Sequence, residues 1–260
     1  MKTRIADQPF VRKHSIVRNI WGSADTILFI FAGSSAEFAL NKAVDWLYFT
    51  GRLPSDPLGR LFSTVAYARM IVFSGTADAN AAIDKITAIH SHVEKERKAS
   101  IPDWAYRDVL YMLIYYSIVS FELLERKMTE DEKEEVYDVF YRVGTRMGLT
   151  LLPADYSEWL VSRETHLQND LIKSVHTADL YKQYRKHLGN TRFWVLCESQ
   201  KMILPPIAKE MLHLENRQWV RPLVPLYKIL KRFHCDRLVK MILLPEKYKA
   251  QIFALDNYGK

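Results

Sequence analysis

Residues 83–93 read Ile83-Asp-Lys-Ile-Thr-Ala-Ile-His-Ser-His-Val93, and this stretch indicates the fold class. Its apolar residues recur every three or four positions, so they share one face of an amphipathic helix. The same period runs through most of the 260-residue chain, which holds only nine glycines and ten prolines. No segment alternates strictly between apolar and polar residues, as a half-buried strand would. We therefore expect an all-α protein, a multi-helix bundle.

One residue on that apolar face is not apolar. His90 follows Ile83 and Ile86 on the same side of the predicted helix and precedes Val93. An imidazole that faces a core needs a partner for its ring nitrogens, and a carboxylate, a carbonyl, a water or a metal ion can serve. His90 is thus either a hydrogen-bonded core histidine or a metal ligand. His92 points away from that face, and we expect it in solvent.

Local signals mark the ends of further helices. Asp56-Pro57 supplies a cap and a first-turn proline for a helix that runs to about Phe73. Thr129-Glu-Asp-Glu132 is typical of a capping box. The remaining predicted elements are a polar arm over 1–20, a helix over about 23–50, a helix over about 103–126, and one or two helices over about 157–184.

The basic residues gather at the two ends of the chain. Residues 217–249 carry nine Lys or Arg against two acids, and this surplus equals the net charge of +7 of the whole chain. We expect a core with a basic N-terminal arm over 1–185 and a basic helical extension packed on it over 186–260. Such ends fit an anionic membrane surface or an anionic ligand, although a solvated helix face is the commoner outcome.

Several classes of protein are disfavoured by what the sequence lacks. Two isolated cysteines, Cys197 and Cys235, are too few for a disulfide framework or a cysteine-based zinc site. No nucleic-acid motif accompanies the basic residues, so we expect no nucleic-acid partner. Common nucleotide, zinc-protease and nucleophile-elbow motifs are absent. With no secretory signal and no apolar run of membrane-spanning length, we expect a cytoplasmic protein, with peripheral membrane association as an open alternative.

Four segments in order resemble a known family. They are Ser55-Asp-Pro-Leu-Gly-Arg-Leu-Phe-Ser-Thr64, Val72-Phe-Ser-Gly75, Ile89-His90, and residues 132–152 after an apolar helix. Together they resemble the MpaB-type and latex-clearing-protein (rubber oxygenase) superfamily, in particular its short bacterial branch of unknown function. The resemblance covers residues 26–165 well and the tail more loosely. It implies an all-α fold with a globin-like core, haem b and the use of dioxygen.

The resemblance also assigns roles to residues of this chain. His90 matches the axial ligand of the haem iron. Arg60 and Thr64 match a distal Arg-x-x-Lys-Thr pattern, in which Ser63 stands where the lysine would be. On a helix Arg60 and Thr64 point to one side, where they could donate hydrogen bonds to bound oxygen or to a haem propionate. From the residues alone, Arg60 can instead pair with an acid, and Thr64 can serve helix packing.

Glu37 is an acid among apolar residues, and two interpretations of it stay open. It could be a catalytic base like the conserved acid of the superfamily, but pairing with an arginine is the more common situation of such a residue. The chain also departs from the short bacterial branch. Ser34-Ser35 stands where that branch usually has His-Pro, and Leu113 stands near a position that is usually histidine. His166, His176 and His187 are too far apart to form a metal-binding face on a helix, so we expect them at the surface.

Two functions follow as hypotheses. The first is a haem-b-dependent oxygenase that acts on a hydrophobic small molecule, isoprenoid-like or polyunsaturated, with His90 as iron ligand and Arg60, Ser63 and Thr64 on the opposite side. The second is a non-catalytic lipid- or pigment-binding protein that keeps the scaffold and has lost haem. Ser63 and the missing histidines favour the second hypothesis. A third possibility is an interaction module that docks on anionic membrane through its basic ends.

Overall fold

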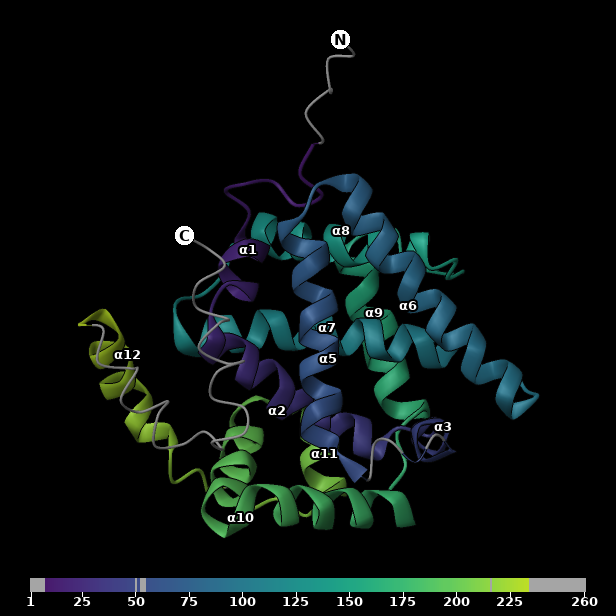
Figure 1. The fold of residues 1–260 in the computed structure, drawn as a ribbon. Helices are drawn as coiled ribbons and strands as arrows, with labels where there is room; N and C mark the ends of the chain where they lie inside the picture. Colours follow the sequence, from purple (N-terminus) through teal and green to yellow (C-terminus); the bar gives the residue numbers. More distant parts are fainter. Residues whose placement is uncertain (1–7, 50, 52–54, 216, 234–260) are drawn as a thin grey trace.

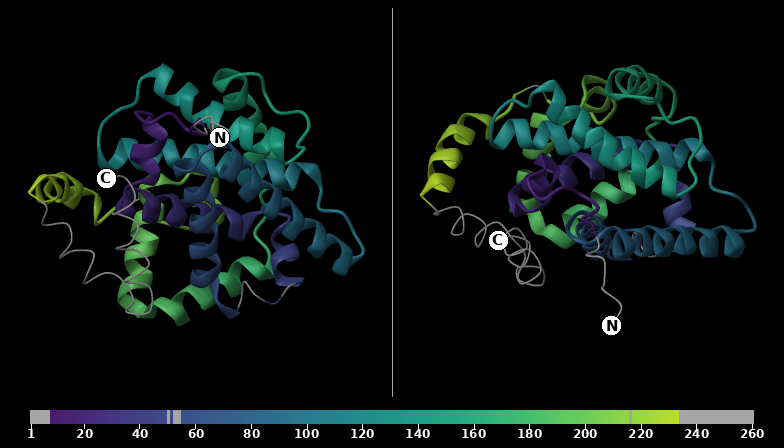
Figure 2. Two further views of the ribbon diagram at one scale, coloured as in Figure 1. Left: turned by 45° about the horizontal axis from the view of Figure 1, so that its top comes forward. Right: turned by 90° about the horizontal axis from the view of Figure 1, so that it is seen from above.

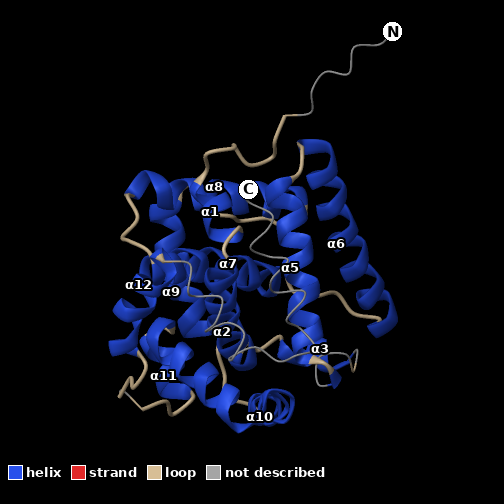
Figure 3. Cartoon of the chain, turned by 60° about the vertical axis from the view of Figure 1, so that its left-hand side comes forward, coloured by secondary structure: helices blue, strands red, loops and turns tan. Residues whose placement is uncertain are grey.

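The fold is known from a computed structural model, which describes residues 8–49, 51, 55–215 and 217–233. Within these ranges the chain forms α-helices, one 3-10 helix and no β-strand, as the cartoon in Figure 3 shows. Two isolated β-bridges join Pro9 to Gly75 and Asn41 to Leu171. The expected all-α multi-helix bundle is confirmed.

The helices follow one another through short connections. In chain order they are α1 (Ile16–Trp21), α2 (Ala24–Leu40), α3 (Val44–Phe49), α5 (Pro57–Phe73), α6 (Thr76–Arg97), α7 (Asp103–Leu124), α8 (Glu130–Arg146), α9 (Tyr156–Asn169), α10 (Val175–Ile203), α11 (Pro206–Met211), the 3-10 helix η1 (Arg221–Leu223) and α12 (Val224–Arg232).

Helix α2 lies at the centre of the bundle. Twelve of its 17 residues are buried, so it has no solvent-facing side of any length. Helices α7 and α10 pack against it. Seen from above in Figure 2, α5 and α6 lie on one side of the molecule and α7, α8 and α9 on the other. A helix that is apolar all round belongs in this central position, because every face then removes apolar surface from water.

The predicted helix starts at residues 56 and 129 are confirmed. The side chain of Asp56 accepts a hydrogen bond from the Gly59 amide at 3.0 Å, with Pro57 in the first turn of α5. Thr129 and Glu132 form both halves of the capping box, at 3.2 and 3.0 Å. These contacts pair backbone N–H groups that a helix start leaves without intrahelical acceptors.

The helix predicted over 23–50 is in fact two helices, α2 and α3, separated at Asn41. The side-chain oxygen of Asn41 accepts a hydrogen bond from the Ala43 amide at 2.8 Å, and its nitrogen donates to Asp108 at 2.6 Å. The Lys42 amide donates to the Asp170 carbonyl at 2.9 Å. The helix ends here because its last groups find partners on α7 and after α9, far away in the sequence.

The N-terminal segment differs from the polar arm expected over 1–20. Most apolar side chains from residue 10 to residue 21 are buried in the main core, and the short helix α1 carries several of them. Ser15 caps α1 by accepting a hydrogen bond from the Val17 amide at 3.1 Å. The segment is therefore part of the bundle from residue 10 onwards, because its apolar residues at helical spacing outweigh its charges. The buried residues are Phe10, Val11, Ile16, Val17, Ile20 and Trp21.

The domain boundary expected between residues 185 and 186 falls inside α10. This helix bends at Gly189, whose φ of 74° is not helical and suits glycine. The division into 1–185 and 186–260 stays a prediction, and its last part, 234–260, lies outside the described residues. Among the described helices, none is long and apolar enough to cross a membrane.

Candidate functional site

Helices α5 and α6 form an antiparallel hairpin that carries most of the predicted site residues. They meet at Ser74-Gly75 and diverge away from this turn, as Figure 1 shows. Arg60 and His90 stand the same number of residues before and after Gly75. Because both helices rise equally per residue, these two positions lie at the same height on the hairpin. Arg60 and His90 are 30 residues apart in the sequence, but the hairpin places them at the same distance from its turn.

His90 is half-buried on α6, and its Nδ1 atom is shielded from solvent. Its ring packs on Tyr106 of α7, with 5.2 Å between ring centroids. The Tyr106 hydroxyl donates to Glu94, one turn further along α6, at 3.4 Å. Burial and the Glu94 carboxylate raise the pKa of Tyr106 above its ordinary value, so this phenol stays neutral. The buried residues of α6 are Ala79, Ala82 and Ile83, all before His90, so the half-buried His90 lies at the margin of the core.

The other predicted residues of the hairpin can be compared with His90. His92 is exposed and lies 3.3 Å from Glu96, as the expectation of a solvated residue predicted. On α5, Ser63 and Thr64 are exposed. Arg60 belongs to α5, but its side chain lies outside the described residues. The hairpin therefore places the three α5 residues and His90 at comparable heights, with hydroxyls on one helix and an imidazole on the other.

Glu37 lies apart from this hairpin, in the middle of α2, and forms a buried ion pair. Its exposed fraction is 1%, and the guanidinium of Arg163 on α9 donates to both of its oxygens, at 2.6 and 2.5 Å. The Tyr116 hydroxyl on α7 donates to the same carboxylate at 2.8 Å. The expectation that Glu37 pairs with an arginine is confirmed. Three donors already occupy the carboxylate, so a role as proton acceptor stays a prediction.

The groups around Glu37 keep their usual charges. Burial and the Glu37 charge raise the pKa of Tyr116 well above its ordinary value. Burial alone would lower the pKa of Arg163, but the charge and hydrogen bonds of Glu37 raise it, so the guanidinium stays protonated. The guanidinium also lies over the Tyr115 ring, 5.2 Å from its centroid. Helices α2, α7 and α9 are joined by this one network.

A second buried polar cluster contains His166, which we had expected at the surface. Its Nδ1 contacts Asp108 of α7 and lies 3.0 Å from Asp170, and its side chain is only 11% exposed. One ligand-type atom from each residue falls within 4.8 Å of the others. The other Asp108 oxygen accepts the Asn41 amide. One ring nitrogen between two carboxylates is the arrangement of a hydrogen-bonded histidine, so we interpret the cluster as a joint between helices.

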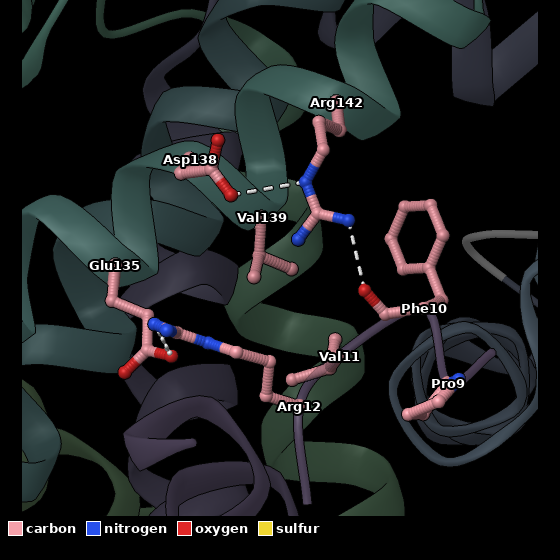
Figure 4. Close-up of a pocket in the computed structure, with 8 residues that line it drawn as sticks. All are labelled: Pro9, Phe10, Val11, Arg12, Glu135, Asp138, Val139 and Arg142. Carbon is pink, nitrogen blue, oxygen red and sulfur yellow. Dashed lines mark hydrogen bonds and ion pairs between the residues drawn. The ribbon is translucent and has the colours of Figure 1, made fainter.

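A cavity of about 330 Å³ lies on another part of the surface, between the N-terminal segment and α8. Figure 4 shows Arg142 at one end, where it donates to Asp138 and to the Phe10 carbonyl at 3.0 and 2.8 Å. At the other end Arg12 pairs with Glu135 at 2.8 Å. The charged groups of the lining thus bind one another and the main chain. We interpret this cavity as the seam where the N-terminal segment docks on α8.

The comparison with protein families agrees with the all-α fold. A family model described as "ER-bound oxygenase mpaB/B'/Rubber oxygenase, catalytic domain" matches residues 22–234. This range spans most of the chain and contains every predicted site residue. The protein thus carries an oxygenase-type catalytic domain, and the chain belongs to the mpaB and rubber oxygenase family. No curated protein and no solved structure matches it.

The sequence did not reveal three polar residues of the interior, Arg163, Asp108 and Asp170. Arg163 lies 126 positions from Glu37, and nothing local distinguishes it from a surface arginine. A signal did exist for His166, because Asp170 follows it by four residues and thus shares its side of a helix. The other acid that contacts His166 is Asp108 of α7, and no pattern in the sequence around His166 indicates it.

Proposed function

We propose that this protein is a haem-b-dependent oxygenase that uses dioxygen on a hydrophobic, isoprenoid-like or polyunsaturated, small molecule. The observation that carries the proposal is the α5–α6 hairpin within an oxygenase-family domain, which sets Arg60 level with His90. The proposed metal ligand is His90. Arg60, Ser63 and Thr64 line the opposite side.

The donor set at the hairpin fits haem better than a free metal ion. A non-haem iron or zinc site needs three or four protein ligands, whereas haem iron needs one axial ligand from the chain. His90 is a single imidazole beside a neutral phenol, Tyr106. Haem bound there would supply the iron at which dioxygen is activated.

The other residues of the proposed site would bind and orient. The hydroxyls of Ser63 and Thr64 and the guanidinium of Arg60 are hydrogen-bond donors of the kind that hold bound oxygen or a propionate. Tyr106 would fix the orientation of the His90 ring by packing on its face. The start of α7, which packs Tyr106 against His90, would provide part of the wall for a hydrophobic substrate.

An absorption spectrum of the freshly purified protein tests this proposal. We expect a Soret band, its loss in His90→Ala, and its retention in His92→Ala, a matched change at an exposed histidine of the same helix. A band that survives in His90→Ala would show that another residue holds the haem. A colourless, iron-free protein that takes up no added haem would overturn the proposal.

A second candidate is a lipid- or pigment-binding protein on the same scaffold without haem. Ser34-Ser35 stands where the short bacterial branch usually has His-Pro, and Ser35 is part of the packing between α2 and α10. Its hydroxyl donates to the Ala32 carbonyl at 3.0 Å and accepts the Gln200 amide at 3.3 Å. Lipid that copurifies in the absence of iron, identified by mass spectrometry, would favour this candidate over the oxygenase.

A further inference from the structure

The last described helix, α12, is amphipathic, but it turns its polar side towards the protein. Lys231 lies 2.8 Å from Asp25 and also pairs with Glu125, and the Tyr227 hydroxyl donates to Asp25 at 3.2 Å. The Lys228 ammonium donates to the Glu125 carbonyl at 3.1 Å. These three residues share one side of the helix, so its polar face is tied to α2 and to the end of α7.

The apolar side of α12 points away from the bundle. Leu226 and Ile229 are 54% and 53% exposed, Leu223 just before them is 56% exposed, and Phe233 just after them is 71% exposed. At about 100° per residue Leu226, Ile229 and Phe233 lie on the side opposite Lys231 and Tyr227, whereas Leu223 belongs to the 3-10 helix η1 that precedes α12. Figure 1 shows α12 at the margin of the fold. Surface helices of globular proteins normally turn their apolar side towards the core. The exposed apolar side of α12 therefore indicates a binding surface.

Buried contacts also hold the segment that leads into α12. Glu198 and Lys201 of α10 form an ion pair at 2.7 Å, with Glu198 only 1% exposed. Glu198 also accepts the Trp219 amide at 2.8 Å, and the Lys201 carbonyl accepts the Gln218 side chain at 2.9 Å. The helix is therefore fixed at its entry by α10 and along its length by Asp25 and Glu125. This double attachment holds the apolar side outward.

The charge around this apolar side is of one sign. Residues 217–233 contain five Lys or Arg and no acid. Arg217, Arg221 and Arg232 are exposed. Trp219 is half-exposed, and the Arg217 guanidinium stacks on its indole ring at 3.6 Å. Aliphatic side chains flanked by basic residues and an indole match the boundary between lipid headgroups and acyl chains.

We propose that α12 docks this protein on the surface of an anionic lipid bilayer, with Leu226, Ile229 and Phe233 inserted among the acyl chains. Charge complementarity selects this occupant. A second copy would bring the exposed Arg217, Arg221 and Arg232 against the same three arginines, and residues 234–260 of the same chain carry more basic than acidic residues. The proposal is independent of the chemistry of the α5–α6 hairpin. A nine-residue helix inserts little apolar area, so we expect weak, reversible binding.

Vesicle flotation of the full chain tests this docking. The vesicles are pure phosphatidylcholine in one arm and phosphatidylcholine with about a third phosphatidylglycerol in the other, at low and at physiological salt. We expect the protein to float with the anionic vesicles at low salt, to float less at higher salt, and to remain in the soluble fraction with phosphatidylcholine alone.

Two variants and one control separate the contributions. Leu226→Ser/Ile229→Ser should weaken partitioning by about tenfold or more, because two half-exposed aliphatic side chains leave the interface. Arg221→Gln/Arg232→Gln should weaken it by a similar factor at low salt only. The matched control, Leu160→Ser/Val161→Ser, removes two exposed apolar side chains of α9 and should bind as the unmodified protein does. Unchanged circular dichroism in all variants shows that the fold is intact.

Three results would overturn the proposal. The first is that the unmodified chain does not float with anionic vesicles at low salt. The second is that Leu226→Ser/Ile229→Ser floats as well as the control does. The third is a dimer in solution that dissociates in Leu226→Ser/Ile229→Ser but not in the control, because the apolar side would then be an interface between copies of this chain.

Discussion

Gly33 of α2 touches the ring of Tyr116 of α7, and this contact sets the distance between the two central helices. A Cβ atom at position 33 would lie 2.2 Å from the Tyr116 ring, well inside any real contact distance. Tyr116 is fully buried and its hydroxyl is bound to Glu37, so the ring cannot move aside easily. Glycine is therefore required at this position for close approach rather than for its backbone freedom.

We predict that Gly33→Ala lowers the free energy of unfolding by about 1–3 kcal/mol, the usual cost of overpacking. Alanine gains about 1 kcal/mol of helix propensity, which offsets only part of the clash. Gly144→Ala in α8 is the control, because its Cβ would meet the flexible ends of Leu110 and Leu152, at 2.8 and 3.0 Å. That control should lose clearly less stability than Gly33→Ala in thermal denaturation, because flexible leucine ends can shift and alanine favours the helix. Equal losses for the two variants would contradict this interpretation.

The buried pair of Glu37 and Arg163 should be costly to break from one side. We expect Arg163→Met to lose about 3–5 kcal/mol in urea denaturation, because it leaves an uncompensated carboxylate in the core. The same change at Arg146, which binds Asp84 through two hydrogen bonds in an exposed position, should cost far less, because solvent screens that pair.

The double variant Glu37→Gln/Arg163→Met refines this test. Because it removes both charges, it should lose less than the sum of the two single losses, with a coupling on the order of 0.5–3 kcal/mol. Strict additivity would show that the two groups do not depend on each other.

The cluster around His166 gives a pH dependence whose sign follows from Asp170. Burial, together with the charge of Asp108, raises the pKa of Asp170 above its ordinary value of 3.8. An acid with a raised folded pKa binds its proton more tightly when folded, so its ionisation lowers stability as the pH rises. We expect Asp170→Asn to gain stability relative to the parent as the pH rises from 3.8 through the folded pKa. Thermal denaturation across that range measures it, and a change of the opposite sign would refute the assignment.

Glu132 at the start of α8 should show the opposite sign. Its hydrogen bonds with Arg126 and with the Thr129 amide lower its pKa to about 2. Its contribution to stability is therefore present above the unfolded pKa and is lost as the pH falls towards 2. We expect Glu132→Gln to be less stable than the parent at neutral pH, by no more than about 1 kcal/mol for this surface pair. The difference should shrink in acid, and a constant difference would show that the charge is not involved.

Local chemistry determined which parts of the fold could be predicted. The starts of α5 and α8 were predicted because Asp56 and Thr129 bind backbone amides within their own first turns. The break at Asn41 was missed because its partners belong to α7 and to the segment after α9. The prediction of a polar arm over 1–20 fails from residue 10 onwards, because the burial of that part depends on packing against helices formed much later in the chain.

The residues of the candidate site also differ in whether the sequence could predict them. The helix of His90 and the pairing of Glu37 with some arginine were predictable, because an inward-facing polar group needs a partner. Which arginine binds Glu37 was not, since Arg163 belongs to another helix. The packing of His90 against Tyr106 was not predictable either, because Tyr106 belongs to α7 and not to the helix of His90.

The ion pair in the middle of the bundle has a consequence for biosynthesis. A nascent chain that has left the ribosome only as far as α8 already contains Glu37, but not the guanidinium that neutralises it. Packing α2 against α7 at that stage would bury an uncompensated anion, which is strongly unfavourable. The packing of the two helices is thus destabilised until α9 has been synthesised, and the order of translation influences when the interior closes.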